Sequence, residues 1–300
     1  MKGKVVLLGT SSAMPTKDRN NSGVYLGYKG EGFLFDCGEG TQRQIMRAGL
    51  SIYRIDKIFI SHLHTDHILG LPGLIETLDM HDKDSIEIHS VKGLKNVIDC
   101  VLNGVIYAPD IQININEHSF SADVFTIFES KEFRIKAVGL NHVVDCLGFS
   151  FEEKPKRKYN KEKIKQLDLQ GSDFIQLEKV GYINKNGKII KKEEITFVEK
   201  GFKFTYIPDT YRTENIIKLA KESDLLVIES TYLNEENKAR EYGHLTLEYI
   251  LQIYPELECK KIVLTHFSRR YSSLEEFENR IREEGITNIF LGHDFMEISF

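Results

Sequence analysis

The chain has 300 residues, of which 41% are hydrophobic and 28% charged, and its formal net charge is −5. This composition suits one large α/β domain or two smaller ones, and it argues against a membrane-crossing helix, because no run approaches the ~20 apolar residues that such a helix needs. An acidic chain can bind nucleic acid only through local basic patches. The cysteines show no zinc-finger spacing and no disulfide framework, which favours a reducing cytoplasm. They are Cys37, Cys100, Cys146 and Cys259.

The N-terminal segment predicts three strands. Residues 4–8 form an apolar run that is typical of a buried strand. Runs at 24–26 and 33–35 predict two further strands, and the glycine-containing stretch 29–32 between them predicts a turn. After the third strand, residues 36–44 predict the beginning of a helix.

A polar loop, Pro15-Thr16-Lys17-Asp18-Arg19-Asn20, lies between the first and second predicted strands. Lys17 and Arg19 can hold phosphates, and Asn20 can contact or brace a neighbouring group. Taken alone, these residues are explained equally well by a solvated loop with no binding role.

Residues 61–70, with the sequence SHLHTDHILG, are the most informative stretch of the chain, because they place three histidines and one aspartate within six positions. They follow a predicted strand at 58–60 and precede an apolar helix start, so the cluster stands at the carboxyl end of a strand, a usual ligand site in α/β sheets. His62 and His64 project the same way from extended backbone, whereas Asp66 and His67 follow after the chain has begun to turn. Imidazole and carboxylate suit zinc and its first-row neighbours, so this loop predicts ligands for two metals. The alternative is a polar turn with chance histidines.

Later in the chain, polar residues again follow predicted strands. The predicted strands are 85–89, 133–140, 147–151, 202–207, 225–228, 261–264 and 289–291, and the predicted helices are 93–102, 213–222 and 247–253. Within two residues of a strand end stand His142, Asp209, Glu229, His266 and His293. The remaining histidines have no ligand-type neighbours in sequence and are expected on the surface or in the core. They are His81, His89 and His118.

The 61–70 motif resembles the metal-binding motif of the metallo-β-lactamase superfamily. Three further matches narrow the resemblance to the ribonuclease Z family, whose members trim the 3′ end of precursor tRNA: the loop at 15–20, the segment 36–44 and the sequence Gly243-His244-Leu245-Thr246. The resemblance runs from Leu8 to about Met296, apart from one insert. The chain departs from the family pattern at two positions. Ile228 stands where relatives often have a histidine, and Leu245 replaces the serine of a His-Ser-Thr motif.

The resemblance implies an α/β fold, a four-layer αββα sandwich of the metallo-β-lactamase type, formed by one domain over 1–300 with an arm inserted at about 152–200. It implies two zinc ions per chain, with manganese as an alternative. One ion would be held by His62, His64 and His142, the other by Asp66, His67 and His266, with Asp209 shared between them. Asp36 would lie behind the site and brace a ligand histidine. His293 would have at most a similar supporting role.

The resemblance also implies the catalytic groups and partners. Asp66 would orient the attacking water and take its proton, and His244, oriented by Glu229, would protonate the leaving ribose 3′-oxygen. The products would be a tRNA with a 3′-hydroxyl and a trailer with a 5′-phosphate. The family's loop corresponding to Lys17, Arg19 and Asn20 is tied to choosing the cleavage position. The expected partner is precursor tRNA, and the expected protein is a cytoplasmic homodimer without a membrane segment.

The insert is the most divergent part of the chain. Residues 151–200 hold 13 Lys and Arg residues against 9 Asp and Glu residues, a net charge of +4, so the rest of the chain carries −9 to give the total of −5. In the family this place carries an arm that grips the tRNA elbow, but the usual glycine-proline signature is missing here, and 184–188 predicts a turn. The expected RNA-binding residues are Lys154, Lys156, Arg157 and Lys158. A merely charged helical surface remains the alternative.

Two rival functions remain open at this stage. A dinuclear hydrolase of small esters or cyclic nucleotides would use the same metal site without RNA contacts, and the 15–20 loop and the basic insert argue against it. A catalytically silent RNA-binding subunit would have lost metal ligands, and the complete ligand set argues against that.

Overall fold

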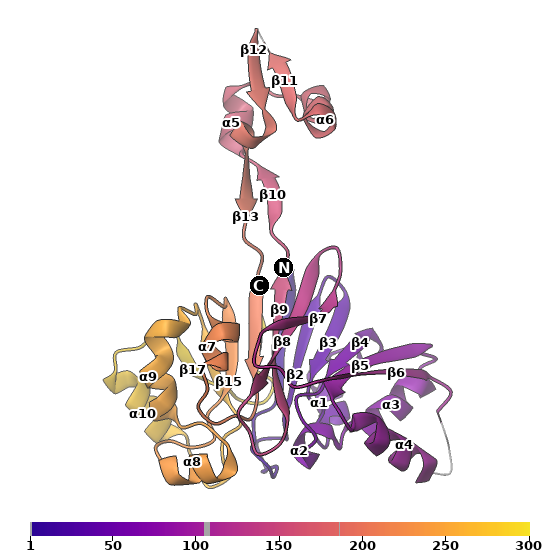
Figure 1. Cartoon of the computed structure of the whole chain (residues 1–300), viewed down its shortest axis with the longest axis vertical. Coiled ribbons are helices and arrows are strands. Elements are labelled where there is room, and N and C mark those ends of the chain that lie inside the picture. Colours follow the sequence, from indigo (N-terminus) through magenta and orange to yellow (C-terminus); the bar gives the residue numbers. More distant parts are fainter. Residues whose placement is uncertain (1, 105–108, 186) are drawn as a thin grey trace.

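A computed structural model describes residues 2–104, 109–185 and 187–300, and over these residues it contains two large sheets packed face to face (Figure 1). The first sheet has the strand order β18-β1-β2-β3-β4-β5-β6. Its strands are β1 Gly3–Gly9, β2 Gly23–Tyr28, β3 Glu31–Phe35, β4 Ile55–Phe59, β5 Ser85–Val91, β6 Gln112–His118 and β18 Glu297–Ser299.

The second sheet has the strand order β17-β16-β15-β14-β9-β8-β7. Its strands are β7 Phe125–Glu129, β8 Phe133–Leu140, β9 Cys146–Glu153, β14 Lys203–Ile207, β15 Leu225–Glu229, β16 Ile262–Thr265 and β17 Ile289–Leu291. The predicted strands 133–140 and 289–291 have the bounds that the structure gives β8 and β17, and the other predicted strands lie within a few residues of observed ones.

Helices cover the outer face of each sheet. The helices on the side of the first sheet are α1 Thr41–Arg47, α2 Thr65–Ile68, α3 Leu71–Met80 and α4 Leu94–Gly104, with a short 3₁₀ turn at Ile52–Arg54. The second sheet is associated with α7 Asn215–Ala220, α8 Glu236–Tyr242, α9 Leu247–Leu257 and α10 Glu275–Glu283.

Three buried layers hold the sandwich together. Between the sheets, aromatic rings interlock, with Phe35 against Phe59 at 5.2 Å and against Phe204 at 5.4 Å between ring centroids. One outer layer joins α1, α3 and α4 to the first sheet, and the other joins α7, α9 and α10 to the second sheet. Full burial of each such apolar side chain contributes roughly 1.5–3 kcal/mol. The predicted four-layer αββα sandwich is therefore confirmed.

The strand directions bring the polar residues of distant segments to one edge. In the first sheet β3, β4, β5 and β6 run parallel, and in the second sheet β14, β15, β16 and β17 do the same. Since parallel strands present their carboxyl ends at one edge, the residues that follow β4, β14, β15 and β16 meet there. β8 also ends at this edge, because it runs antiparallel to β9, and β9 runs antiparallel to β14.

The insert forms an arm that projects from the opposite end of the sandwich, where both chain termini lie (Figure 1). It leaves after Glu153 and returns before Lys203. The stem is β10 Lys156–Tyr159 paired with β13 Thr196–Glu199, and the head contains α5 Lys161–Gln166, α6 Gly171–Val180, β11 Tyr182–Lys185, β12 Lys188–Lys191 and the 3₁₀ turn Lys192–Ile195. The head has its own small core, made by Leu169, Leu177, Ile183, Ile190 and Ile195.

The predicted turn at 184–188 falls between β11 and β12, which pair as an antiparallel hairpin, although its central residue, Asn186, lies outside the described residues. All four cysteines are free thiols, as expected. None of the helices over the described residues has the length and apolar character needed to cross a membrane.

Candidate metal centre

The 61–70 loop is fixed by close backbone packing behind it. The chain continues extended beyond β4 as far as His64, whose φ and ψ are −66° and 147°, and then enters α2. A Cβ atom on Gly70 would lie 2.2 Å from the carbonyl oxygen of Gly38, so a residue with a side chain does not fit there. The extended part presents His62 and His64, and α2 presents the next two candidate ligands, as the spacing predicted.

Three histidines and one aspartate converge at the first position. His62 Nε2 lies 3.0 Å from His64 Nδ1, which lies 3.3 Å from His142 Nε2. Asp209 Oδ2 lies 3.7 Å from His62 Nε2 and 4.0 Å from His142 Nε2. Burial lowers the pKa of all three histidines, most strongly that of His62, so they are neutral imidazoles with lone pairs available to a metal.

The second position is formed by Asp66, His67 and His266, again with Asp209. Asp209 Oδ1 lies 3.4 Å from His67 Nε2 and 3.1 Å from His266 Nε2, and Asp66 Oδ2 lies 3.5 Å from each of these nitrogens. His67 Nε2, His266 Nε2 and Asp209 Oδ1 are buried and have no hydrogen-bond partner among the described residues. Buried polar atoms are nearly always paired, so three unpaired atoms facing one point fit a bound cation. The residues present therefore fit a metal site.

Hydrogen bonds on the far side of the rings set which nitrogen faces the site. His142 Nδ1 donates to the carbonyl oxygen of Gly243 at 2.8 Å, and His67 Nδ1 donates to Asp36 Oδ2 at 2.7 Å. His266 Nδ1 lies 2.9 Å from the Thr231 hydroxyl, which itself donates to a carboxylate, so the imidazole is the donor in this pair. In each ring the Nε2 lone pair is thereby left facing the cluster.

Asp36 lies behind the site and accepts several hydrogen bonds. Its carboxylate accepts hydrogen bonds from the backbone N–H and the hydroxyl of Ser61, at 2.8 and 2.9 Å, and from the hydroxyl of Tyr206 at 2.9 Å, besides the bond from His67. Its backbone has a φ of +57°, and that of the candidate ligand His266 is +59°. Non-glycine residues adopt such conformations only when their surroundings hold them there, so both are locked in place by the packing.

The charges of the cluster favour a cation. Burial by itself raises the pKa of Asp209, but His266 and His67 outweigh it and hold that pKa well below its usual range. Burial likewise lowers the pKa of His67, and here Asp209, Asp36 and Asp66 outweigh it and raise the pKa well above the usual value. Carboxylates that attract a proton this strongly attract a metal ion at the same place.

His244 and Glu229 form a hydrogen-bonded pair beside the cluster. His244 Nδ1 donates to Glu229 Oε1 at 3.0 Å, and it lies 4.0 Å from Asp209 Oδ2. The carboxylate of Glu229 is fully buried and also accepts from the backbone N–H groups of Thr210 and Thr231. Burial lowers the pKa of His244, but the Glu229 carboxylate more than offsets this and raises it to about 9. The imidazole is thus held as a proton carrier, with 13% of its side chain exposed.

Comparison with known proteins places this centre in a family. A protein from Methanothermobacter thermautotrophicus, named Ribonuclease Z, is 37% identical over 91% of this chain and 89% of its own length. Another of the same name from Protochlamydia amoebophila is 36% identical over 99% of this chain and 96% of its own length.

The chain belongs to the ribonuclease Z family.

Solved structures agree with this family assignment. The short form of human tRNase Z is 29% identical and superposes with a TM-score of 0.71. The superposition covers 99% of this chain and 98% of the human chain. The metallo-β-lactamase fold protein YhfI from Bacillus subtilis, 14% identical with a TM-score of 0.70 over the whole of both chains, supports the fold alone. The family model described as Anti-Pycsar protein Apyc1 matches residues 3–164, and that of the beta-lactamase superfamily domain matches 194–267. Each of these models covers one part of the chain, whereas the ribonuclease Z relatives align with nearly all of it.

The two departures from the ribonuclease Z pattern are core positions in this chain. Ile228 and Leu245 are 0% and 1% exposed and belong to the apolar layer between the second sheet and its helices. Neither residue belongs to the metal cluster, so the substitutions leave the ligand set intact.

The segment that leads into the loop expected to contact RNA lies directly beside the cluster. The backbone N–H of Ala13 donates to Asp66 Oδ2 at 2.9 Å. Lys17 is exposed, whereas the Arg19 guanidinium donates to the carbonyl oxygen of Tyr271 at 2.7 Å and the Asn20 amide donates to that of Glu39 at 2.8 Å. The structure thus gives Arg19 and Asn20 a part in shaping the loop, and leaves Lys17 open to solvent.

The basic residues at the base of the arm lie far from the cluster and are mostly paired. Lys154 binds Glu129 at 2.6 Å, Lys156 binds Glu153 at 3.1 Å and Lys158 binds Glu199 at 2.6 Å, while Arg157 donates to the Thr196 hydroxyl at 3.0 Å. β9 links this region to the site, because Cys146 at its start lies 3.7 Å from His62 Nδ1. Its eight residues span about 26 Å, which separates the arm's root from the metal cluster.

The remaining histidines are outside the cluster. His89 is buried, stacks on Phe59 at 5.1 Å between centroids and lies 3.0 Å, Nδ1 to Nε2, from His118. His81 lies on the surface at the end of α3, and His293 is exposed with its Nδ1 facing the carbonyl oxygen of Asp294. His293 has no contact with the metal cluster among the hydrogen bonds of the described residues.

The sequence predicted no role for Ser61, Thr231 and Tyr206, which orient the candidate ligands and the residues that support them. Thr231 follows Glu229 by two positions, and its hydroxyl donates to Glu229 Oε2 at 2.6 Å while accepting from His266. Hydroxyl residues next to candidate ligands were the only available signal, and it is a weak one, because serine and threonine are common at strand ends.

Proposed function

We propose that this chain is a zinc-dependent endoribonuclease that cleaves precursor tRNA at its 3′ end, removes the trailer and leaves a 3′-hydroxyl on the tRNA. The observation that carries the proposal is the convergence of two buried ligand groups, with unpaired nitrogen and oxygen atoms, beside the His244–Glu229 pair. The names of the full-length relatives, Ribonuclease Z, support the substrate and the reaction.

In this proposal each ligand group would hold one zinc ion, and Asp209 would be shared between the two groups. The first group is His62, His64 and His142, and the second is Asp66, His67 and His266. When bound, two such ions supply positive charge that stabilises the oxyanions developing at the scissile phosphate. Asp36 keeps His67 in the tautomer and orientation that ligation requires.

Asp66 has a second role in the proposal. The neighbouring His67 and His266 lower the pKa of Asp66 strongly in spite of its burial, so the group is ionised and can only accept. One of its oxygens is already anchored by the Ala13 N–H. The carboxylate can therefore orient an attacking water molecule and take its proton, while its position is held by the segment that leads into the loop expected to contact RNA.

His244 is proposed as the general acid. The ribose 3′-oxygen is a poor leaving group, because its alkoxide is far more basic than water at neutral pH, so a proton must be delivered to it. Glu229 keeps His244 protonated, and the exposed part of the ring leaves it within reach of a substrate that the fully buried Glu229 cannot contact. Glu229 thus acts through His244.

We further propose a homodimer. The arm of one chain points away from its own metal cluster, and about 26 Å of β9 separates its root from the site. A second copy would bring an arm and a metal cluster to the same RNA. Sedimentation of the purified protein tests this proposal, and a monomer at working concentrations would reject it.

The alternative of a small-phosphodiester hydrolase is favoured by one observation. Lys154, Lys156 and Lys158 are neutralised by glutamates, which leaves less free positive charge for RNA than their number suggests. The deciding experiment compares kcat/KM for a precursor tRNA and for bis(p-nitrophenyl) phosphate. We expect strong preference for the RNA, with a single cut at the trailer junction. A protein that hydrolyses the small diester but leaves precursor tRNA intact would overturn the proposal.

A further inference from the structure

The arm is joined to the sandwich by two single connections, and its direction is decided at that junction. The stem strands β10 and β13 pair only with one another in the sheet topology, and Figure 1 shows the ribbon standing clear of the sandwich. An isolated two-stranded ribbon is marginally stable and bends easily. Contacts at the root must therefore fix where the head of the arm points.

Glu153, the last residue of β9, lies at that root with only 1% of its side chain exposed. Its Oε1 accepts from the Tyr28 hydroxyl at 2.9 Å and from Lys156 Nζ at 3.1 Å. Its Oε2 accepts from Lys2 Nζ and from the backbone N–H of Phe202, each at 3.4 Å. We refer to these five residues as the root cluster.

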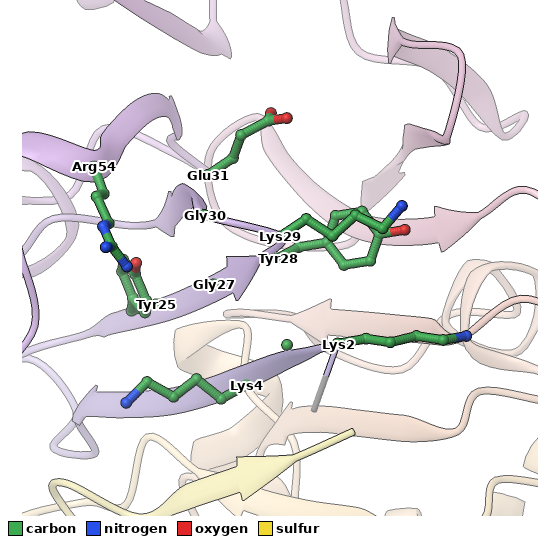
Figure 2. A pocket seen from close by; sticks show the side chains of 10 residues that line it. Lys2, Lys4, Tyr25, Gly27, Tyr28, Lys29, Gly30, Glu31 and Arg54 are labelled. Carbon is green, nitrogen blue, oxygen red and sulfur yellow. The ribbon is translucent and has the colours of Figure 1, made fainter.

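The root cluster connects four separate parts of the molecule. Lys2 and Tyr28 belong to the first sheet, and Figure 2 shows their side chains leaving neighbouring strands in the same direction. Lys156 is the first residue of the stem strand β10, and Phe202 lies on the connection by which the arm returns to β14. A single carboxylate thus ties both arm connections to the sandwich.

Close backbone and ring contacts flank Glu153 at the junction. A Cβ atom on Gly201 would lie 1.9 Å from the carbonyl oxygen of Glu153, so the two connections touch at this point. The ring of Phe202 stacks on that of Phe300 at 3.6 Å between centroids, and that of Tyr28 packs against Phe151 at 5.1 Å. Beside these contacts the surface is hollowed, in a pocket whose lining includes Lys2, Gly201, Phe202 and Phe300.

The negative charge of Glu153 favours the observed direction of the arm over others. Burial by itself raises its pKa, but the hydrogen bonds from Tyr28 and Lys156 outweigh it and bring the pKa to about 2. The group is therefore a buried ion at neutral pH. A buried ion is strongly destabilised when one partner is removed, so an arm direction that separates Lys156 from Glu153 is disfavoured.

We propose that Glu153 is a positioning residue that fixes the direction of the arm relative to the metal cluster by holding Lys156 to the sandwich. The inference rests on the proposed function in one respect, that the arm grips precursor tRNA. A pre-oriented arm lowers the ordering cost of binding, so its loss is expected in KM and to leave kcat unchanged.

The direct test measures the spread of arm directions. Spin labels on Cys100, which is exposed on α4, and on Lys188→Cys in the arm head report the distance between body and arm, since the other cysteines are buried. Pulsed electron spin resonance should give a narrow distance distribution for the otherwise native protein. With Glu153→Gln we expect the distribution to be about two-fold broader, because the charged anchor is lost.

A matched pair of lysine variants keeps the test decisive if Glu153→Gln does not fold. Lys156→Met removes the arm's side of the anchor, whereas Lys158→Met removes the same charge two residues along the same strand. Lys158 pairs with Glu199, which belongs to the stem itself. Both variants lose one positive charge, so non-specific attraction to RNA falls equally. Broadening with Lys156→Met alone supports the proposal, and equal distributions in the two variants overturn it.

Kinetics separate this inference from the proposed function. For Glu153→Gln we expect the KM for precursor tRNA to rise about ten-fold through the added ordering cost, with unchanged kcat and unchanged hydrolysis of bis(p-nitrophenyl) phosphate. A broad distribution with an unchanged KM would uphold the positioning role and instead remove the arm from the proposed RNA-binding surface. A narrow distribution in both Glu153→Gln and Lys156→Met would overturn the positioning role, whatever the KM.

Discussion

The edge of the sandwich that carries the candidate metal ligands and the arm are built on opposite principles. At the edge, several candidate ligands are held from behind by a residue of another element, as His67 is by Asp36 and His266 by Thr231. In the arm, polar contacts run mostly between residues of the arm itself, such as Lys158 with Glu199, and the root cluster carries the link to the sandwich. Geometry is therefore fixed by several buried hydrogen bonds at the edge, and by the root cluster together with more exposed ion pairs such as Lys154 with Glu129 at the root of the arm. The two regions should consequently fail independently.

The largest effect is expected from a substitution among the candidate metal ligands, which leaves the arm unchanged. Asp66→Ala removes a candidate ligand and the proposed proton acceptor, so turnover of precursor tRNA should fall by roughly 10²–10⁴-fold or more. RNA affinity depends mostly on phosphate contacts elsewhere and should stay within a few-fold. Single-turnover cleavage and gel-shift titration on the same preparation measure the two quantities. Near-normal turnover would exclude Asp66 from the catalytic centre.

A smaller effect is expected from removing the general acid. His244→Ala should slow cleavage of precursor tRNA by roughly 10²-fold, but should slow bis(p-nitrophenyl) phosphate much less, because nitrophenolate leaves without protonation. Glu229→Gln should show the same difference between substrates in milder form, since it acts only through the imidazole. Equal slowing of both substrates would assign His244 to positioning instead.

The next prediction concerns removal of the arm, which leaves the candidate metal ligands unchanged. Replacing residues 154–192 with a short Gly/Ser linker should weaken precursor tRNA binding about ten-fold and flatten its salt dependence, because phosphate contacts and their released counterions are lost. Zinc content and small-diester hydrolysis should not change, since none of the candidate ligands lies in this segment. An unchanged salt slope and KM would reduce the arm to a solvated surface and raise the small-diester alternative.

The smallest expected effect is a pH-dependent loss of thermal stability when Glu153 of the root cluster is substituted. The pKa of Glu153 is lowered from 4.5 to about 2, so its stabilising effect is present above about pH 4.5 and is lost as the pH falls toward 2. After any bound metal has been removed with a chelator, the difference in Tm between the native protein and Glu153→Gln should be largest at pH 7 and should be smaller at pH 3. Glu162→Gln is the control, because Glu162 is exposed on α5 in the arm head and does not belong to the root cluster. A Tm difference that does not depend on pH would exclude an ionised Glu153.

The sequence predicted the edge well because its signal is local and dense. Four candidate ligands stand within six positions at 62–67, and the family resemblance then selected His142, Asp209 and His266 among the polar residues at strand ends. Strand β8 was predicted in full, because buried residues alternate along its first half and run continuously through the rest. No such density marks the supports: Thr231 and Tyr206 act across 35 and 170 residues of sequence.

The elements that escaped prediction have weak apolar signals. β6 is an edge strand whose residues are all at least partly exposed, and α10 is built largely from Glu and Arg. In the arm, the small core is spread thinly over 169–195, so composition indicated a basic segment but not its helices and hairpin. The pairing of its lysines with glutamates such as Glu129, far away in sequence, could not be read from local charge at all.

The origin of the ligands in both sheets has a thermodynamic consequence. His62, His64, Asp66 and His67 follow a strand of the first sheet, whereas His142, Asp209 and His266 follow strands of the second. Metal ions bound at the proposed sites would join the two sheets, so their binding free energy would add to the stability of the packing between them. Chelation should therefore loosen the sandwich first at this edge, with amide hydrogen exchange rising there before it rises in the aromatic layer.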